Sequence, residues 1–208
     1  HKRIFDGDKG PNTGGMGTYA PAPVLTDALR DAAMKTILEP MVAAMEKEGM
    51  PYVGCLYAGL MITDEGPKVV EFNARFGDPE TQVVLPLLDS DLGEIMMACA
   101  KGTLTSNMVK WKDSSAACVI LASKGYPETS SKGDVISGDI KQYDTTIVFH
   151  SGTKLVGENY VTNGGRVLGV VGLGKDLRTA LDRAYERIEH IDFEGMQYRT
   201  DIGAKAFK

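Results

Sequence analysis

Residues 70–76 read VEFNARF, a segment in which apolar and polar side chains alternate. Successive side chains of a β-strand point to opposite faces. One face of this strand is therefore apolar and the other polar, the first with Val70, Phe72, Ala74 and Phe76 and the second with Glu71, Asn73 and Arg75. An apolar segment at 54–63 precedes it, separated by the turn residues 64–67. Together they predict an antiparallel hairpin, with the returning strand running over 68–76.

The polar face of this strand has a selective chemistry. Glu71 and Asn73 offer oxygen atoms, the ligands that Mg²⁺ or Mn²⁺ prefers. Arg75 adds a planar guanidinium that suits phosphate oxygens. A metal beside an arginine is what phosphoryl transfer from a triphosphate needs. Plain amphipathicity, or a Glu–Arg ion pair, would account for the same pattern.

The strand is followed by Gly77-Asp78-Pro79-Glu80. Pro79 suits the first turn of a helix, because that position needs no N–H donor. Asp78 could cap this helix, which composition alone favours, or it could accept hydrogen bonds from a ligand amine.

A second candidate is the glycine-rich segment 6–17, which reads DGDKGPNTGGMG. Glycines let backbone N–H groups approach an anion closely, and His1, Lys2 and Arg3 lie just upstream. The segment is neither a Walker P-loop nor a dinucleotide-binding fingerprint. A flexible surface loop is the simpler interpretation, and residues 1–25 as a whole read as loop.

The rest of the chain divides near residue 113. Before it, Thr26 and Asp27 begin a helix that Pro40 must kink or restart, and Ser90 caps another running to about Lys101. After it the pattern is β-rich, with strands at 116–123 and 146–150, a hairpin across 163–165 into 166–173, and a helix over 176–191. We therefore expect two domains, 1–112 and 113–208.

Composition excludes several classes of function. The chain has 208 residues, 43% of them hydrophobic, and a net charge of −5. Because no basic run exists, nucleic acid is excluded as a partner. No apolar run reaches the roughly 18 residues of a membrane span. Three widely spaced cysteines predict reduced thiols in a cytoplasmic protein rather than disulfides or zinc.

Several segments in order resemble the phosphoribosylamine–glycine ligase family of ATP-grasp enzymes. They are HKRIFDGDKGPNTGGMGTYAPAP, YVGCLYAGLMIT and GPKVVEFNARFGDPETQ, followed by ASKGYPE, KGDVISG, VFHSGT, VTNGGRVLGVVGLG and YRTDIG. The resemblance implies an α+β fold: the second half of an ATP-grasp core, an antiparallel sheet with helices, followed by a small β-rich α+β domain.

The resemblance also implies a reaction in which ATP, glycine and 5-phosphoribosylamine give ADP, phosphate and glycinamide ribonucleotide through a glycyl phosphate. Its implied metal ligands, for Mg²⁺ or Mn²⁺, are Glu71 and Asn73, and Arg75 is implied on the ATP phosphates. Catalytic roles fall on Arg75 and Asp78. The residues implied at the substrates are Lys2, Arg3, Pro11, Asn12, Thr13, Gly14, Gly15, Asp78 and Glu80.

Two departures from the family pattern matter. The preceding strand, Tyr57 to Met61, supplies no second metal carboxylate. No counterpart of the family's N-terminal domain, adenine-binding hinge and lid precedes His1, so we expect the missing N-terminal half of the same enzyme as a partner. This chain alone should bind ATP weakly and catalyse poorly. The alternatives are another ATP-grasp carboxylate–amine ligase and a non-catalytic C-terminal fragment.

Overall fold

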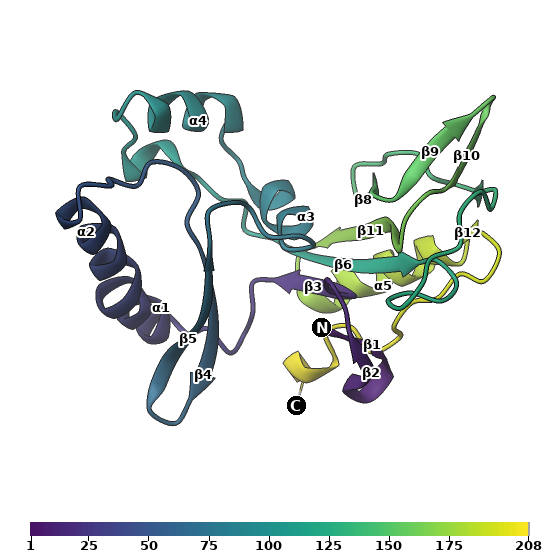
Figure 1. The fold of residues 1–208 in the computed structure, drawn as a ribbon, viewed down its shortest axis with the longest axis horizontal. Helices are drawn as coiled ribbons and strands as arrows, with labels where there is room; N and C mark the ends of the chain where they lie inside the picture. Colours follow the sequence, from purple (N-terminus) through teal and green to yellow (C-terminus); the bar gives the residue numbers. More distant parts are fainter. Residues whose placement is uncertain (208) are drawn as a thin grey trace. The chain divides into compact units, whose positions relative to one another are not determined.

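The computed structural model describes residues 1–207, which form two compact units built from interleaved stretches of chain (Figure 1). We call residues 1–21, 78–87 and 113–207 the sheet unit, and residues 22–77 and 88–112 the hairpin unit. Residue 113 begins the last stretch of the sheet unit, but residues 1–21 and 78–87 belong to that unit as well. The division into family domains at 112 and 113 stays a prediction.

The sheet unit holds most of the strands. Its elements are β1 (Arg3–Phe5), η1 (Asp6–Asp8), β2 (Lys9–Asn12), β3 (Gly17–Ala20), α3 (Thr81–Val84), η3 (Leu85–Leu87), β6 (Ser115–Ala122), β7 (Ser137–Gly138), β8 (Thr146–His150), β9 (Thr153–Val156), β10 (Asn159–Thr162), β11 (Arg166–Gly174), α5 (Leu177–Ile188), β12 (Ile191–Asp192) and η5 (Ala204–Phe207). The strands predicted at 116–123 and 146–150 are thus confirmed.

A four-stranded antiparallel sheet in the order β3-β6-β11-β8 forms the centre of this unit. Every residue of β6 is buried, because both faces of the sheet are covered. Ala117, Val119 and Leu121 join the cluster under α5. Ala116, Cys118 and Ile120 join the cluster under α3 and η3. Because successive side chains of a strand point to opposite faces, β6 contributes to two hydrophobic cores.

Helix α5 packs unusually close to β11. Leu177, Ala180, Leu181, Ala184 and Ile188 form its buried face, as their helical spacing predicts. A Cβ on Gly172 would lie 2.0 Å from the Ala180 carbonyl oxygen, so no other residue fits there at this helix–sheet distance. Asp176 caps the helix by accepting a hydrogen bond of 2.8 Å from the Thr179 amide.

The hairpin unit contains α1 (Asp27–Ala33), η2 (Met34–Leu38), α2 (Glu39–Lys47), β4 (Tyr57–Thr63), β5 (Gly66–Asn73), α4 (Leu92–Ala100) and η4 (Ser106–Met108). Thr26 caps α1, as predicted. Pro40 stands in the first turn of α2, directly after a π-helical turn, so the predicted restart is confirmed. The antiparallel pairing of β4 with β5 confirms the predicted hairpin.

Three local predictions are wrong. Asp91, not Ser90, caps α4; the Ser90 hydroxyl instead accepts from the Lys110 amide. Residues 163–165 do not close a hairpin, because β10 pairs with β9 while β11 pairs with β6 and β8. Residues 1–25 are not simply loop, since β1 and β2 pair with each other there and β3 pairs with β6.

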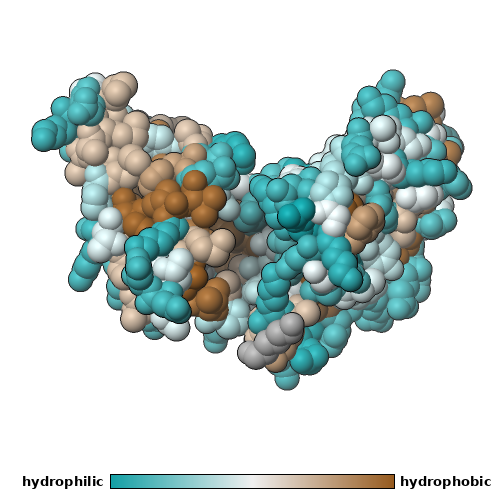
Figure 2. Space-filling view, turned by 60° about the horizontal axis from the view of Figure 1, so that its bottom comes forward, coloured by the Kyte–Doolittle hydropathy of each residue, from teal (hydrophilic) through white to brown (hydrophobic). Residues whose placement is uncertain are grey.

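The apolar side of the hairpin is not covered within residues 1–207. A bulge displaces Val70, which is 65% exposed, and Ala74 and Phe76 are exposed as well. Phe72 alone of this face is half-buried. Figure 2 shows hydrophobic colour gathered on the hairpin unit, at the left of the view.

Candidate functional site

The glycine-rich segment is held by its own hydrogen bonds. The Thr13 amide and hydroxyl both donate to the Lys2 carbonyl at 2.8 Å, and the Gly15 amide donates to the Thr13 hydroxyl at 2.9 Å. Thr13 is buried, and Met16 beside it is fully buried. The segment is therefore not an irregular loop: it contains η1, β2 and the start of β3, and these hydrogen bonds hold the backbone at Thr13 and Gly15.

The segment meets the turn after β5 at one arginine that sequence reasoning missed. Arg166 Nη1 lies 3.2 Å from the Gly14 carbonyl oxygen, 3.1 Å from that of Asp78 and 3.2 Å from Asp78 Oδ1. The Gly14 amide donates to the Tyr126 hydroxyl at 2.9 Å. The structure thus brings Gly14, Gly15 and Asp78 together, and β11 supplies the residue that joins them.

Asp78 is not a helix cap. The residue at the N-cap of α3 is Glu80, and no side chain caps that helix. Instead, Asp78 Oδ1 accepts from Gln82 Nε2 at 3.0 Å and faces Arg166, while its side chain remains 48% exposed. A carboxylate held through one oxygen and open to solvent can still accept a proton or bind an amine.

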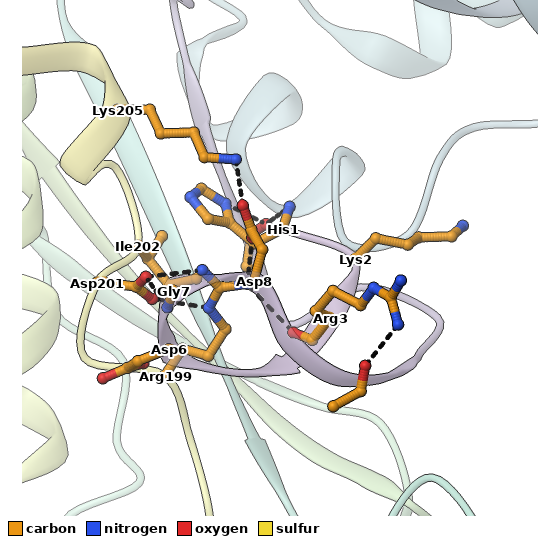
Figure 3. A network of polar contacts seen from close by, with 12 residues as sticks. His1, Lys2, Arg3, Asp6, Gly7, Asp8, Arg199, Asp201, Ile202 and Lys205 are labelled. Atoms are coloured by element: carbon orange, nitrogen blue, oxygen red, sulfur yellow. Dashed lines mark hydrogen bonds and ion pairs between the residues drawn. The ribbon is translucent and has the colours of Figure 1, made fainter. Parts of the chain in front are cut away.

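The other predicted substrate residues are spread along the segment. Lys2, Pro11 and Asn12 are exposed, and Glu80 is half-buried. Arg3 donates to the Gly10 carbonyl at 2.6 Å, so its guanidinium is already engaged across the β1–β2 hairpin. Figure 3 shows the Lys2 side chain extending away from the Arg199 cluster described next.

A buried ion cluster ties the segment to the end of the chain (Figure 3). Arg199 is 1% exposed and donates to Asp201 at 2.7 and 2.8 Å, to Asp8 at 2.9 Å and to the Arg3 carbonyl at 3.2 Å. Asp8, at φ 55°, also pairs with Lys205. The hydrogen bonds from Arg199 hold the pKa of Asp201 well below its usual range, and those from Lys205 and Arg199 lower the pKa of Asp8.

The predicted metal residues lie on the hairpin unit. Glu71 and Asn73 are two positions apart on β5, and Asn73 Nδ2 lies 3.3 Å from Glu71 Oε1. Gly59 pairs opposite Glu71, where its missing side chain leaves room for the carboxylate. Strand β5 ends at Asn73, so the prediction that Arg75 extends the same strand face is wrong; its guanidinium donates to the Phe76 carbonyl at 3.0 Å.

Two oxygen-bearing side chains fit a hard divalent cation only in part, since such a cation takes about six ligands. Within residues 1–207 no group of three His, Cys, Asp or Glu side chains could hold a metal. Water and phosphate oxygens would have to supply the remaining ligands. This donor set is typical of a cation that arrives with a nucleotide rather than one bound permanently.

Two family models match the chain in order. The model described as the ATP-grasp (A) domain of phosphoribosylglycinamide synthetase matches residues 1–81, and the model of its C domain matches residues 116–205. The chain belongs to the phosphoribosylglycinamide synthetase family.

Among residues 1–207, the helices are all too short or too polar to span a membrane.

Named relatives agree with this family. The phosphoribosylamine–glycine ligase of Caulobacter vibrioides is 53% identical over 211 residues, covering 100% of this chain and 49% of its own length. A trifunctional purine biosynthetic protein, adenosine-3 of Gallus gallus, is 52% identical over 99% of this chain and 21% of its own length. The chain thus spans about half, or less, of the curated relatives it matches.

Solved structures confirm the predicted fold class. The crystal structure of the phosphoribosylamine–glycine ligase of Thermotoga maritima matches 97% of this chain and 49% of its own, with TM-score 0.86 and 37% identity. The biotin carboxylase domain of the Hydrogenobacter thermophilus 2-oxoglutarate carboxylase matches 88% of this chain and 40% of its own, with TM-score 0.64 and 14% identity. The second likeness concerns the fold alone: mixed helix and antiparallel sheet of the ATP-grasp type.

Proposed function

We propose that the longer protein containing this chain joins glycine to 5-phosphoribosylamine at the expense of ATP, in the de novo synthesis of purines. The observation that carries the proposal is the match of both family models, in order, to residues 1–81 and 116–205. The 53% identical relative from Caulobacter vibrioides is a phosphoribosylamine–glycine ligase, which supports this choice of substrates.

The reaction has two steps. A carboxylate oxygen of glycine attacks the γ-phosphorus of ATP, the bond to the β-phosphate oxygen breaks, and ADP leaves glycyl phosphate behind. The amine of phosphoribosylamine then attacks the carbonyl carbon, a C–N bond forms, and the bond to the phosphate oxygen breaks. Phosphate leaves, and the nitrogen gives up one proton. Catalysis of such transfers rests mainly on positioning and on neutralising phosphate charge.

The hairpin unit would serve the nucleotide. Glu71 and Asn73 would hold the divalent cation, Mg²⁺ or Mn²⁺, through their oxygen atoms. The hydrogen bond of 3.3 Å that Asn73 Nδ2 donates to Glu71 Oε1 supports a shared site, because it keeps the two side chains next to each other. Such a cation, when bound, neutralises charge on the triphosphate. Arg75, exposed beyond the end of β5, would bind the phosphates.

The sheet unit would serve the amine. The backbone of residues 11–15 would hold the phosphorylated amino-sugar, with Lys2 and Arg3 adding positive charge. Asp78 and Glu80 would line the amine and glycine pocket. The contacts of Arg166 with Gly14 and with Asp78 support this role, since they join the two predicted parts of the pocket.

The remaining partner would be the N-terminal half of the same enzyme. The Caulobacter vibrioides relative is about twice as long as this chain, and the exposed apolar side of the hairpin, which includes Val70, is surface that another segment would cover. We expect the whole enzyme to act in the cytoplasm, without a nucleic-acid or membrane partner.

The test uses the longest natural polypeptide that contains this chain. ADP release is followed with Mg-ATP, glycine and phosphoribosylamine generated in the assay, and each component is omitted in turn. Release that requires both co-substrates, with formation of the amide product, would establish the ligase. Release that ignores glycine or the amino-sugar would transfer the chain to another ATP-grasp carboxylate–amine ligase.

A further inference from the structure

Arg166 begins β11 and sends its side chain to the junction of two segments far away in the sequence. The side chain is only 20% exposed. Nη1 contacts the carbonyl oxygens of Gly14 and Asp78 and the Asp78 carboxylate, and it lies 3.5 Å from the Gly15 carbonyl oxygen. One cation therefore fixes the relative position of the glycine-rich segment and of the turn that carries Asp78.

Two glycines of the segment, Gly14 and Gly15, leave room for this arginine and for the neighbouring turn. A Cβ on Gly14 would lie 3.0 Å from Arg166 Cζ and 3.1 Å from its Nε and Nη2, so the guanidinium lies directly against Gly14. A Cβ on Gly15, at φ 120°, would lie 2.7 Å from Pro79 Cδ. The Gly-Gly pair thus allows the segment to pack against both Arg166 and the Asp78–Pro79 turn.

The orientation of Asp78 follows from the same contacts. Both Arg166 Nη1 and Gln82 Nε2 approach Oδ1, at 3.2 and 3.0 Å. The carboxylate is therefore restrained at one oxygen, while almost half of the side chain is open to solvent. A group restrained in this way meets a ligand at little further cost in side-chain entropy.

We propose that Arg166 is a positioning residue for the amine-capture step, acting through Gly14, Gly15 and Asp78. This inference rests on the proposed ligase function. In that step the amine nitrogen bonds to the carbonyl carbon of glycyl phosphate, the bond to phosphate breaks, and one proton passes by way of Asp78 to solvent. Water attacking the same carbon would return glycine and phosphate. Correct placement of the amine therefore decides between product and futile ATP hydrolysis.

The experiment compares ADP released with amide product formed, in the longest natural polypeptide containing this chain. For the unchanged protein the ratio should be close to one. Arg166→Lys keeps the charge but offers a point-like ammonium instead of a planar fork. We expect the ratio to rise severalfold and KM for the amino-sugar to rise roughly tenfold, because the shorter side chain cannot lie against Gly14 and also keep the contacts of Nη1 with Gly14 and Asp78. KM for ATP should stay the same.

Gly14→Ala is the second variant, since it displaces the guanidinium while Arg166 remains. It should uncouple ATP hydrolysis in the same sense, and it decides the matter if Arg166→Lys fails to fold. Arg178→Lys, an exposed arginine of α5 in the same unit, is the matched control and should leave the ratio at one.

The inference is overturned if Arg166→Lys or Gly14→Ala folds, releases one ADP for each amide formed, and keeps its KM for the amino-sugar. A failure of the proposed function itself would look different, because the unchanged protein would then release ADP without requiring both co-substrates.

Discussion

Replacing Arg199 by Met should selectively destabilise the sheet unit. Arg199 is almost fully buried, and its guanidinium carries two bonds to Asp201, one to Asp8 and one to the Arg3 carbonyl. Met fills a similar volume but cannot pair with either carboxylate. Two negative charges would then face each other beside a backbone carbonyl, with Asp8 already in the left-handed region at φ 55°.

The magnitude follows from the burial of the partners. Removing one member of a fully buried ion pair costs about 3–5 kcal/mol. Here the Asp8 and Asp201 side chains are 38% and 27% exposed, so water can solvate both carboxylates in part. We therefore expect the free energy of unfolding to fall by about 2–3 kcal/mol in Arg199→Met.

Urea denaturation followed by far-ultraviolet circular dichroism measures this loss, and hydrogen exchange read by mass spectrometry locates it. Exchange should accelerate first in residues 3–12 and 197–203. Arg30→Met is the matched control: Arg30 also pairs with two aspartates, at 2.8 Å each, but its side chain is 55% exposed. That variant should unfold at nearly the same urea concentration as the original chain. If Arg199→Met behaves like this control, the buried cluster does not stabilise the unit.

The other predictions concern pH, metal and packing. Because the carboxylates bound to Arg199 have lowered pKa values in the folded chain, their contribution to stability is present above the ordinary carboxyl pKa of about 4 and disappears as pH falls below it. The difference in unfolding free energy between the original chain and Arg199→Met should therefore shrink between pH 6 and pH 2, and a constant difference would refute the assignment. Glu71→Gln in the longest natural polypeptide should cut turnover at least tenfold at low Mg²⁺ without changing the melting temperature. Glu65→Gln, on the turn of the same hairpin, should change neither the turnover nor the melting temperature. Gly172→Ala should lower the free energy of unfolding by about 3 kcal/mol, and with it the melting temperature, because the added Cβ would collide with the α5 backbone. Leu155→Ala, on an exposed strand, should change the melting temperature little, and equal effects of the two variants in a thermal melt would contradict the packing argument.

Local patterns predicted the elements that depend on local chemistry. The alternation at 70–76 and the turn at 64–67 gave the β4–β5 hairpin, and the apolar stripe of α5 gave its buried face. Pro40 predicted a restart because the missing N–H acts within one helix turn. These signals need no knowledge of distant segments.

Some misses are local, such as the cap of α4 and the end of β5, but the larger ones involve pairing between strands. The Asn163-Gly164-Gly165 turn reads as a hairpin, but the backbones of Gly164 and Gly152 pack together there, and the chain returns to the sheet instead. Residues 1–25 looked irregular because β3 finds its partner in β6, about a hundred residues later. Pairing of an edge strand with a distant strand produces little recognisable pattern in a short stretch of sequence.

The candidate site shows the same limit. Asp78, Gly14 and Gly15 were named from sequence, but Arg166 was not, because it lies in a segment whose NGGRV pattern indicates only a turn and a strand. Its importance comes from contacts across 88 and 152 positions of sequence. A glycine pair whose missing side chains make room for an arginine is visible only once the chain is folded.

The interleaving of the two units has a consequence for how the chain is made. Synthesis delivers every residue of the hairpin unit by Lys112, whereas the sheet unit needs its first 21 residues to wait for β6, β11 and Arg199. The hairpin unit can therefore mature while still attached to the ribosome, whereas β3 cannot pair with β6 until residues 115–122 have been made. For the same reason, splitting the gene after residue 112 would not separate two folding units: the downstream product would lack β3 at one sheet edge and α3 over one core, and it would need the upstream product to supply both in trans.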